Sequence, residues 1–105
     1  MRIGLVIGTV TLSRWHPSLS GAAYRLATPL TLDELASPGF AAGNAHPQGE
    51  PIVVYDELGA GLGSRIAISE GGEAAQPFYP NDKPIDAYNA AILDVIDVNE
   101  RRIAD

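Results

Sequence analysis

Glycine and proline interrupt this chain so often that short strands fit it better than long helices. The sequence holds 11 Gly and 8 Pro in 105 residues, and these two residue types mark turns. Between them stand runs rich in Val, Ile and Thr, which suit a pleated, half-buried sheet. A chain of this length forms one domain with a modest core, so association with further copies would add useful burial.

Four of these runs indicate strands, at residues 3–13, 22–32, 51–58 and 65–69. Gly4 and Gly8 predict a bend, a bulge or a close backbone approach in the first, and neither of its faces is strongly polar, so we expect both to be covered. Pro29 marks an edge, a bulge or the end of the second strand. Residues 85–98 fit a helix or a strand equally well by periodicity. About five strands with many turns are typical of a small barrel.

The remaining segments are turns and loops. Residues 33–48 form the clearest loop, which is long for so small a domain and is either functional or a tolerated insertion. Residues 71–80 are rich in turn formers, with room for one helical turn at 73–76. We therefore expect one β-barrel domain over residues 1–98, with a long loop at 33–50, and a polar tail at 99–105.

The charge and the cysteine content narrow the classes of partner. A net charge of −6 and a pI of about 4.7 argue against nucleic acid and against an anionic membrane surface. The absence of cysteine excludes disulfides and thiolate metal sites. No apolar run approaches the roughly 20 residues of a membrane helix, and the apolar start holds two glycines without a cleavage site. We expect a cytoplasmic protein.

Residues 59–63 (GAGLG) follow a predicted strand, as the glycines of a dinucleotide-binding turn do. That turn requires a helix afterwards, whose amides hold the pyrophosphate. Here the glycines lead into residues 65–69, which are too short and too β-rich for that helix, and Ser64 and Arg65 stand where the third glycine is needed. We therefore interpret the glycines as backbone geometry, permitting positive φ angles and close packing.

The residues that usually carry chemistry form no recognisable set. His16 and His46 lack the compact spacing of a metal site. Ser13 lies near His16, but no third group is available to orient the histidine. The acidic residues of the C-terminal region lack the spacing of a calcium loop; they are Asp82, Asp86, Asp94 and Asp97. We predict no catalytic, cofactor or metal site. Trp15 is either a surface anchor or a side chain that closes one end of a barrel.

Three blocks occur in order along the chain: MRIGLVIGTV at 1–10, YDELGAGLG at 55–63, and DKPIDA at 82–87 followed by AILD at 91–94. Together they resemble the EutN/CcmL family of bacterial microcompartment vertex proteins. The resemblance implies a five-stranded, OB-like β-barrel with one short helix. It also implies a strand from about residue 90 to 98, and a cyclic homopentamer that closes the vertices of a shell whose facets are hexameric plates.

Under this interpretation the protein is structural and not an enzyme, with itself and the hexameric facet proteins as partners. The residues expected to shape the backbone or to contact another subunit are Gly59, Ala60, Gly61, Gly63, Asp82, Pro84 and Asp86. A ring of this kind joins two different patches, and we expect opposite charges across the contact. Two other classes stay open on the residues alone: an OB-like module that binds a small ligand or an oligonucleotide, and a small enzyme.

Overall fold

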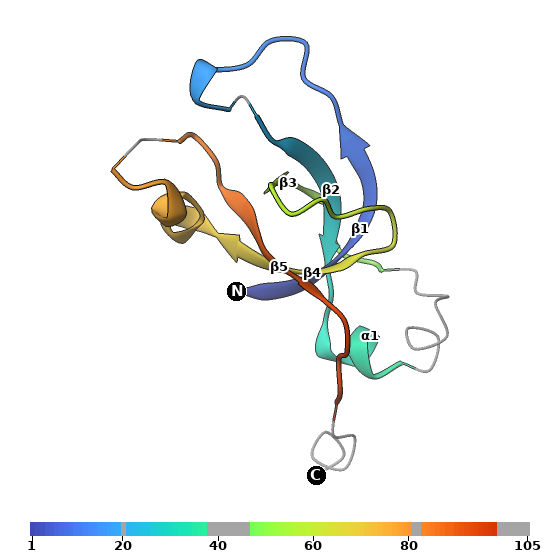
Figure 1. Cartoon of the computed structure of the whole chain (residues 1–105). Coiled ribbons are helices and arrows are strands. Elements are labelled where there is room, and N and C mark those ends of the chain that lie inside the picture. Colours follow the sequence, from blue (N-terminus) through green and yellow to red (C-terminus); the bar gives the residue numbers. More distant parts are fainter. Residues whose placement is uncertain (20, 38–46, 81–82, 99–105) are drawn as a thin grey trace.

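Five strands close into a barrel in the order β1-β2-β3-β5-β4 (Figure 1). The computed structural model describes residues 1–19, 21–37, 47–80 and 83–98. All neighbouring strands are antiparallel except β3 and β5, which are parallel. The predicted all-β class and five-stranded barrel are confirmed. The strands are β1 (Arg2–Val10), β2 (Ala23–Pro29), β3 (Ile52–Asp56), β4 (Arg65–Glu70) and β5 (Ala87–Leu93).

Strand β1 pairs with both β2 and β4, and its two glycines serve different purposes. A Cβ on Gly4 would lie 2.5 Å from Cδ1 of Ile68, so glycine lets β1 pack closely over the core. The β1–β2 register shifts between Val6 and Gly8, which makes Ile7 the extra residue of a bulge. The predicted close approach and bulge are both present. Pro29 ends β2, where its missing N–H costs no ladder bond.

The barrel interior is filled by a small set of apolar side chains. Strands β1, β2, β3 and β5 each contribute one residue to the centre, β4 contributes two, and Ala60 closes it from the loop after β3. The cluster comprises Val6, Ala27, Val54, Ala60, Ile66, Ile68 and Ala87. This core is modest because so short a chain has little interior.

The outward faces of the strands also carry apolar residues. The sequence predicts that both faces of β1 are covered, but in the single chain its outer face stays partly open. Ile7 is 39 % exposed, and Val53 on β3 is 48 % exposed. These side chains leave apolar surface available for another molecule.

The predicted loop at residues 33–50 begins inside helix α1 (Leu32–Ala36), so its first residues are helical. Residues 38–46 of that loop and the predicted polar tail at 99–105 lie outside the described residues. The Thr31 hydroxyl accepts the Glu34 amide, and the Glu34 carboxylate accepts the Thr31 amide, which is a capping box. Glu34 also accepts the amide of Gln48 at 2.9 Å. Amide donation from Thr31 and Gln48 lowers the pKa of the Glu34 carboxyl. The Glu34 carboxylate therefore links Thr31, at the start of α1, to Gln48, which precedes β3.

Two further element boundaries differ from expectation. The turn-rich segment after β4 is a 3₁₀ helix, η2 (Gly71–Phe78), longer than the single turn expected at residues 73–76. The last element is a strand, as the resemblance implies, but β5 begins three residues earlier and ends at Leu93. It begins at Ala87 because Ala87 and Asn89 both point into the barrel and are buried. Among the residues described, no helix is long and apolar enough to cross a membrane.

We predict that Gly4→Ala lowers the free energy of unfolding by about 1–2 kcal/mol, because the new methyl group overpacks against Ile68. Urea denaturation measures this difference. Gly8→Ala is the matched control, since its Cβ would meet only Leu26 at an ordinary 3.8 Å. Ile68→Val removes the clashing Cδ1, so the cost of Gly4→Ala should shrink in that background. Equal costs in both backgrounds would contradict the steric explanation.

Candidate functional site

The carboxylate of Asp56, at the end of β3, is the centre of a buried polar network. Asp56 is 2 % exposed. Its Oδ1 accepts the Leu58 amide and the Asn89 side-chain amide, both at 2.9 Å. Its Oδ2 accepts the Ala60 amide at 2.8 Å and Nε of Arg25 at 3.1 Å. One side chain thereby joins β2, β3, β5 and the glycine-rich loop.

These bonds determine the charge of Asp56. Burial by itself would raise the pKa of the carboxyl group. The hydrogen bond from Asn89, the amides of Leu58 and Ala60, and the Arg25 guanidinium together outweigh burial and lower the pKa below its usual value. Asp56 is therefore a carboxylate at neutral pH and can accept all four donors.

The glycine loop, residues 57–64, lies over this anchor. Gly59 and Gly63 both have φ of +83°, the left-handed region that favours glycine, as the backbone-geometry interpretation expects. Ala60 is buried in the core. Two backbone bonds tie the loop to β1: the Gly63 amide donates to the Val6 carbonyl, and the Val6 amide to the Ser64 carbonyl, each at 2.9 Å.

Gly61 differs from its two neighbours. Its φ is not positive, and a Cβ placed there would meet no atom within 4 Å. The loop also presents two exposed leucines, Leu58 at 49 % and Leu62 at 79 %. The underside of the loop is thus fixed by hydrogen bonds while its outer side is apolar and open. Its contact with another subunit stays a prediction.

The second group of predicted contact residues is Asp82, Pro84 and Asp86, and the structure describes two of them. Asp82 lies outside the described residues. Pro84 and Asp86 are both exposed, and the Asp86 carbonyl accepts the amide of Gly71 at 2.9 Å, which holds the start of η2. In the parts described, no hydrogen bond joins Pro84 or Asp86 to the glycine loop.

Sequence reasoning missed an aromatic cluster built around Tyr55. This ring is nearly buried and packs against three others at centroid distances of 5.5, 5.5 and 6.4 Å; they belong to Tyr24, Phe78 and Tyr88. Burial is the main cause that raises the pKa of the Tyr24 and Tyr88 hydroxyls. The Lys83 ammonium lies 5.0 Å over the Tyr55 ring and 4.6 Å over the Phe78 ring.

The candidate catalytic and metal-binding residues that the structure describes do not come together in one site. In the described ranges, no three His, Cys, Asp or Glu side chains gather closely enough to hold a metal ion. His16 is exposed, and its Nδ1 lies 2.7 Å from Oγ of Ser18. His46 lies outside the described residues. After the glycine loop the chain enters strand β4 at Arg65, where a dinucleotide site needs a helix.

The family model of ethanolamine utilisation protein EutN/carboxysome matches residues 1–94. The chain belongs to this family. Among its relatives, the carboxysome shell vertex protein CcmL of Gloeobacter violaceus is 36% identical over 101 residues, 96% of this chain and 90% of CcmL. The microcompartment shell vertex protein GrpN of Rhodospirillum rubrum is 33% identical over 97 residues, 92% of this chain and 97% of GrpN.

Solved structures agree with this assignment. The GrpN pentameric microcompartment shell protein superposes with a TM-score of 0.72 at 31% identity, covering 94% of this chain and 100% of that chain. Gloeobacter violaceus CcmL superposes with a TM-score of 0.75 at 29% identity, covering 94% and 91%. The resemblance proposed from the three sequence blocks is confirmed, and the Asp56 network lies inside the matched region of this EutN/CcmL family member.

We predict that Asp56→Asn lowers the free energy of unfolding by about 3 kcal/mol. The substitution turns one acceptor into a donor facing other donors and leaves Arg25 without its carboxylate. Urea denaturation measures the loss, and Glu50→Gln, at an exposed position, is the control. A change below about 0.5 kcal/mol, usual for surface substitutions, would show that the network contributes little.

The same carboxylate makes stability depend on pH. Because its folded pKa is lowered, its contribution is present above the unfolded pKa of about 4 and is lost as the pH falls through the folded pKa. We expect the free energy of unfolding to fall more steeply with acid in the wild type than in Asp56→Asn. Parallel pH profiles from pH 6 downwards would contradict this assignment.

Proposed function

We propose that this protein is a structural subunit of a bacterial microcompartment shell, forming rings of five copies that close the shell vertices in the cytoplasm. The observation that carries the proposal is the match, over nearly the whole chain, to proteins described as shell vertex proteins. The pentameric state described for GrpN supports a ring of the same size here.

The surface of the single chain supports assembly. Apolar side chains remain exposed on the outer faces of the strands and on the glycine loop; they include Ile7, Val53, Leu58, Leu62 and Ile92. They lie on different sides of the barrel, on β1, β3 and β5 and on the loop over Asp56. A closed ring needs two different patches on each copy, and interfaces of permanent assemblies are more apolar than ordinary surface.

We also propose that the chain works without catalysis and meets hexameric facet plates where it joins the shell. The support is that its relatives are named for a place in a shell. A wall subunit needs rigid geometry, which the Asp56 network and the tethered glycine loop provide.

Native mass spectrometry at micromolar concentration tests the ring. We expect a species of five times the 11.1 kDa subunit mass. A stable monomer would refute the proposal, because the exposed apolar faces would then have no copy to cover them.

The glycine loop offers a sharper test through Gly61. Gly61→Val should leave the monomer fold intact, since nothing lies within 4 Å of its Cβ, yet weaken the ring tenfold or more if the loop is in the contact. Gly63→Val is the matched comparison: it forces φ of +83° on a branched residue and should lower the stability of the fold itself. An unchanged ring in Gly61→Val would place the loop outside the contact.

A further inference from the structure

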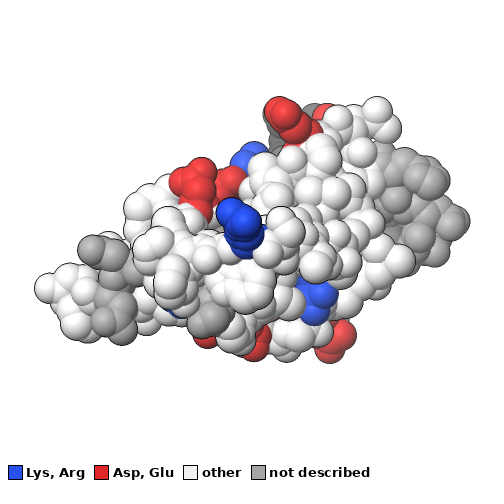
Figure 2. Space-filling model, turned by 90° about the horizontal axis from the view of Figure 1, so that it is seen from above, with Lys and Arg blue, Asp and Glu red and all other residues white. Residues whose placement is uncertain are grey.

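The charges of this chain are separated along its length. Residues 1–32 contain three arginines and no acidic residue, whereas all 13 Asp and Glu follow. In space, the hairpin between β1 and β2 projects from one end of the barrel, and the described segment after β5 leaves towards the other end (Figure 1). Figure 2, seen from the hairpin end, shows Lys and Arg side chains in the middle of this face and Asp and Glu towards its margins.

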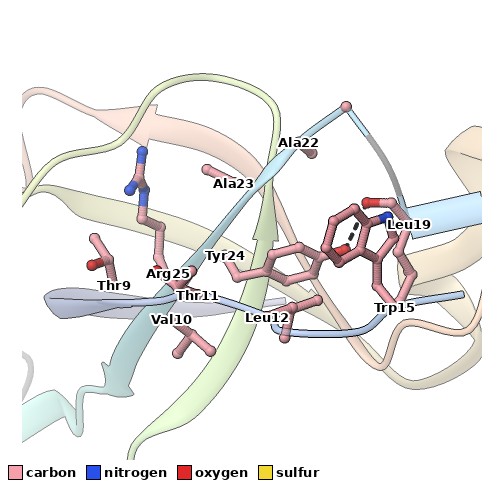
Figure 3. Close-up of a pocket in the computed structure, with 11 residues that line it drawn as sticks. Thr9, Val10, Thr11, Leu12, Trp15, Leu19, Ala22, Ala23, Tyr24 and Arg25 are labelled. Carbon is pink, nitrogen blue, oxygen red and sulfur yellow. Dashed lines mark hydrogen bonds between the residues drawn. The ribbon is translucent and has the colours of Figure 1, made fainter. Parts of the chain in front are cut away.

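The hairpin carries a hollow of about 420 Å³. Its lining includes Val10, Leu12, Trp15, Leu19, Tyr24 and Arg25 (Figure 3). Trp15 is 53 % exposed and therefore does not close the barrel, which leaves the surface-anchor interpretation. We call this hollow, together with Arg14, which precedes Trp15 in the chain, the hairpin pocket. The guanidinium of Arg14 has no hydrogen-bond or ion-pair partner among the residues described.

The hairpin pocket is formed before any partner arrives. The Tyr24 hydroxyl donates to the Leu19 carbonyl at 2.8 Å, and the Lys83 ammonium donates to the Ser18 carbonyl. The Ser18 amide donates to Nδ1 of His16 at 3.2 Å. These bonds fix the 3₁₀ turn η1 (Pro17–Leu19), whose Leu19 lines the pocket, against the aromatic cluster. A preformed wall reduces the ordering cost of binding.

Residues 94–98 have the chemistry that this pocket would accept. The segment reads DVIDV, and Val95 is 81 % exposed while Asp94 and Asp97 are exposed acids. Arg65 donates to the Asp94 carbonyl, which anchors the point where the segment leaves the barrel. If the segment binds in an extended conformation, residues two apart share a face, which would place Val95 and Asp97 on the same side; both are exposed in the single chain.

We propose that residues 94–98 of one copy lie in the hairpin pocket of the next copy, with Val95 against Trp15 and Asp97 beside Arg14. The two surfaces complement each other in both hydrophobicity and charge, and they lie at opposite ends of one subunit (Figure 1). A contact between different patches of neighbouring copies is the kind that a ring uses. This inference rests on the proposed ring and names one of its contacts.

Cysteine crosslinking tests which surfaces meet. The chain has no cysteine, so Thr11→Cys at the pocket rim and Val95→Cys can be prepared as separate proteins and mixed. With a short bifunctional maleimide we expect crosslinked dimers in the mixture and not in either protein alone. Val53→Cys mixed with Val95→Cys is the control pair and should stay uncrosslinked. A ring that forms without 11–95 crosslinks would overturn this contact and leave the proposed pentamer standing.

Trp15 supplies a second readout, because it is the chain's single tryptophan. Its emission should shift to shorter wavelength as the wild-type ring forms, and Val95→Asp should raise the concentration for half-assembly about tenfold or more. Leu32→Asp, at an exposed apolar position on α1, is the control. Arg14→Asp should weaken assembly, and adding Asp97→Arg should restore it.

The outcomes separate the two proposals. If the ring forms while Trp15 keeps the emission of a solvent-exposed indole and Val95→Asp assembles like the wild type, the pocket faces a different partner and the inference is wrong. If the wild type stays monomeric at all concentrations, the proposed function fails and this contact fails with it.

Discussion

The buried carboxylate of Asp56 is the interaction on which the remaining architecture depends. The barrel closes at β3 and β5, and this seam is its weakest, because the two strands share a single parallel residue pair, Tyr55 with Tyr88. Asp56 follows Tyr55 and bonds to the Asn89 side chain, so the network strengthens the barrel where backbone pairing is sparse. The same carboxylate also positions the glycine loop. Both the strengthening of the seam and the position of the loop require Asp56 to stay ionised.

The small core and the apolar outer surface both follow from the short length of the chain. The interior holds few side chains, and the Asp56 hydrogen bonds and the aromatic cluster around Tyr55 join the strands in addition to it. The apolar residues that do not fit inside stay on the outer faces and the glycine loop. Assembly would cover them, which connects the size of the domain to a function in a wall.

Residue patterns in the sequence are sufficient to predict the ends and irregularities of β1 and β2. The sequence also holds a signal for helix α1 that the prediction of a loop did not use. Pro29 ends β2 where a missing N–H predicts it, and Gly4 and Gly8 mark the close approach and the bulge. Thr31 and Glu34 have the spacing of a capping box, so α1 could have been predicted inside the loop. The start of β5 could not, because only inward packing of Ala87 and Asn89 decides it.

The sequence alone determined the class of fold and the family. Frequent turns, β-branched runs and three ordered blocks are local properties, readable without coordinates. Only the tertiary structure decided what Asp56 and Trp15 do. The partners of Asp56 come from positions 25 and 89, which meet because the barrel closes. Trp15 stays exposed because its hairpin extends beyond the barrel. Such contacts depend on the order of the strands in the barrel, which cannot be read from the spacing of residues along the chain.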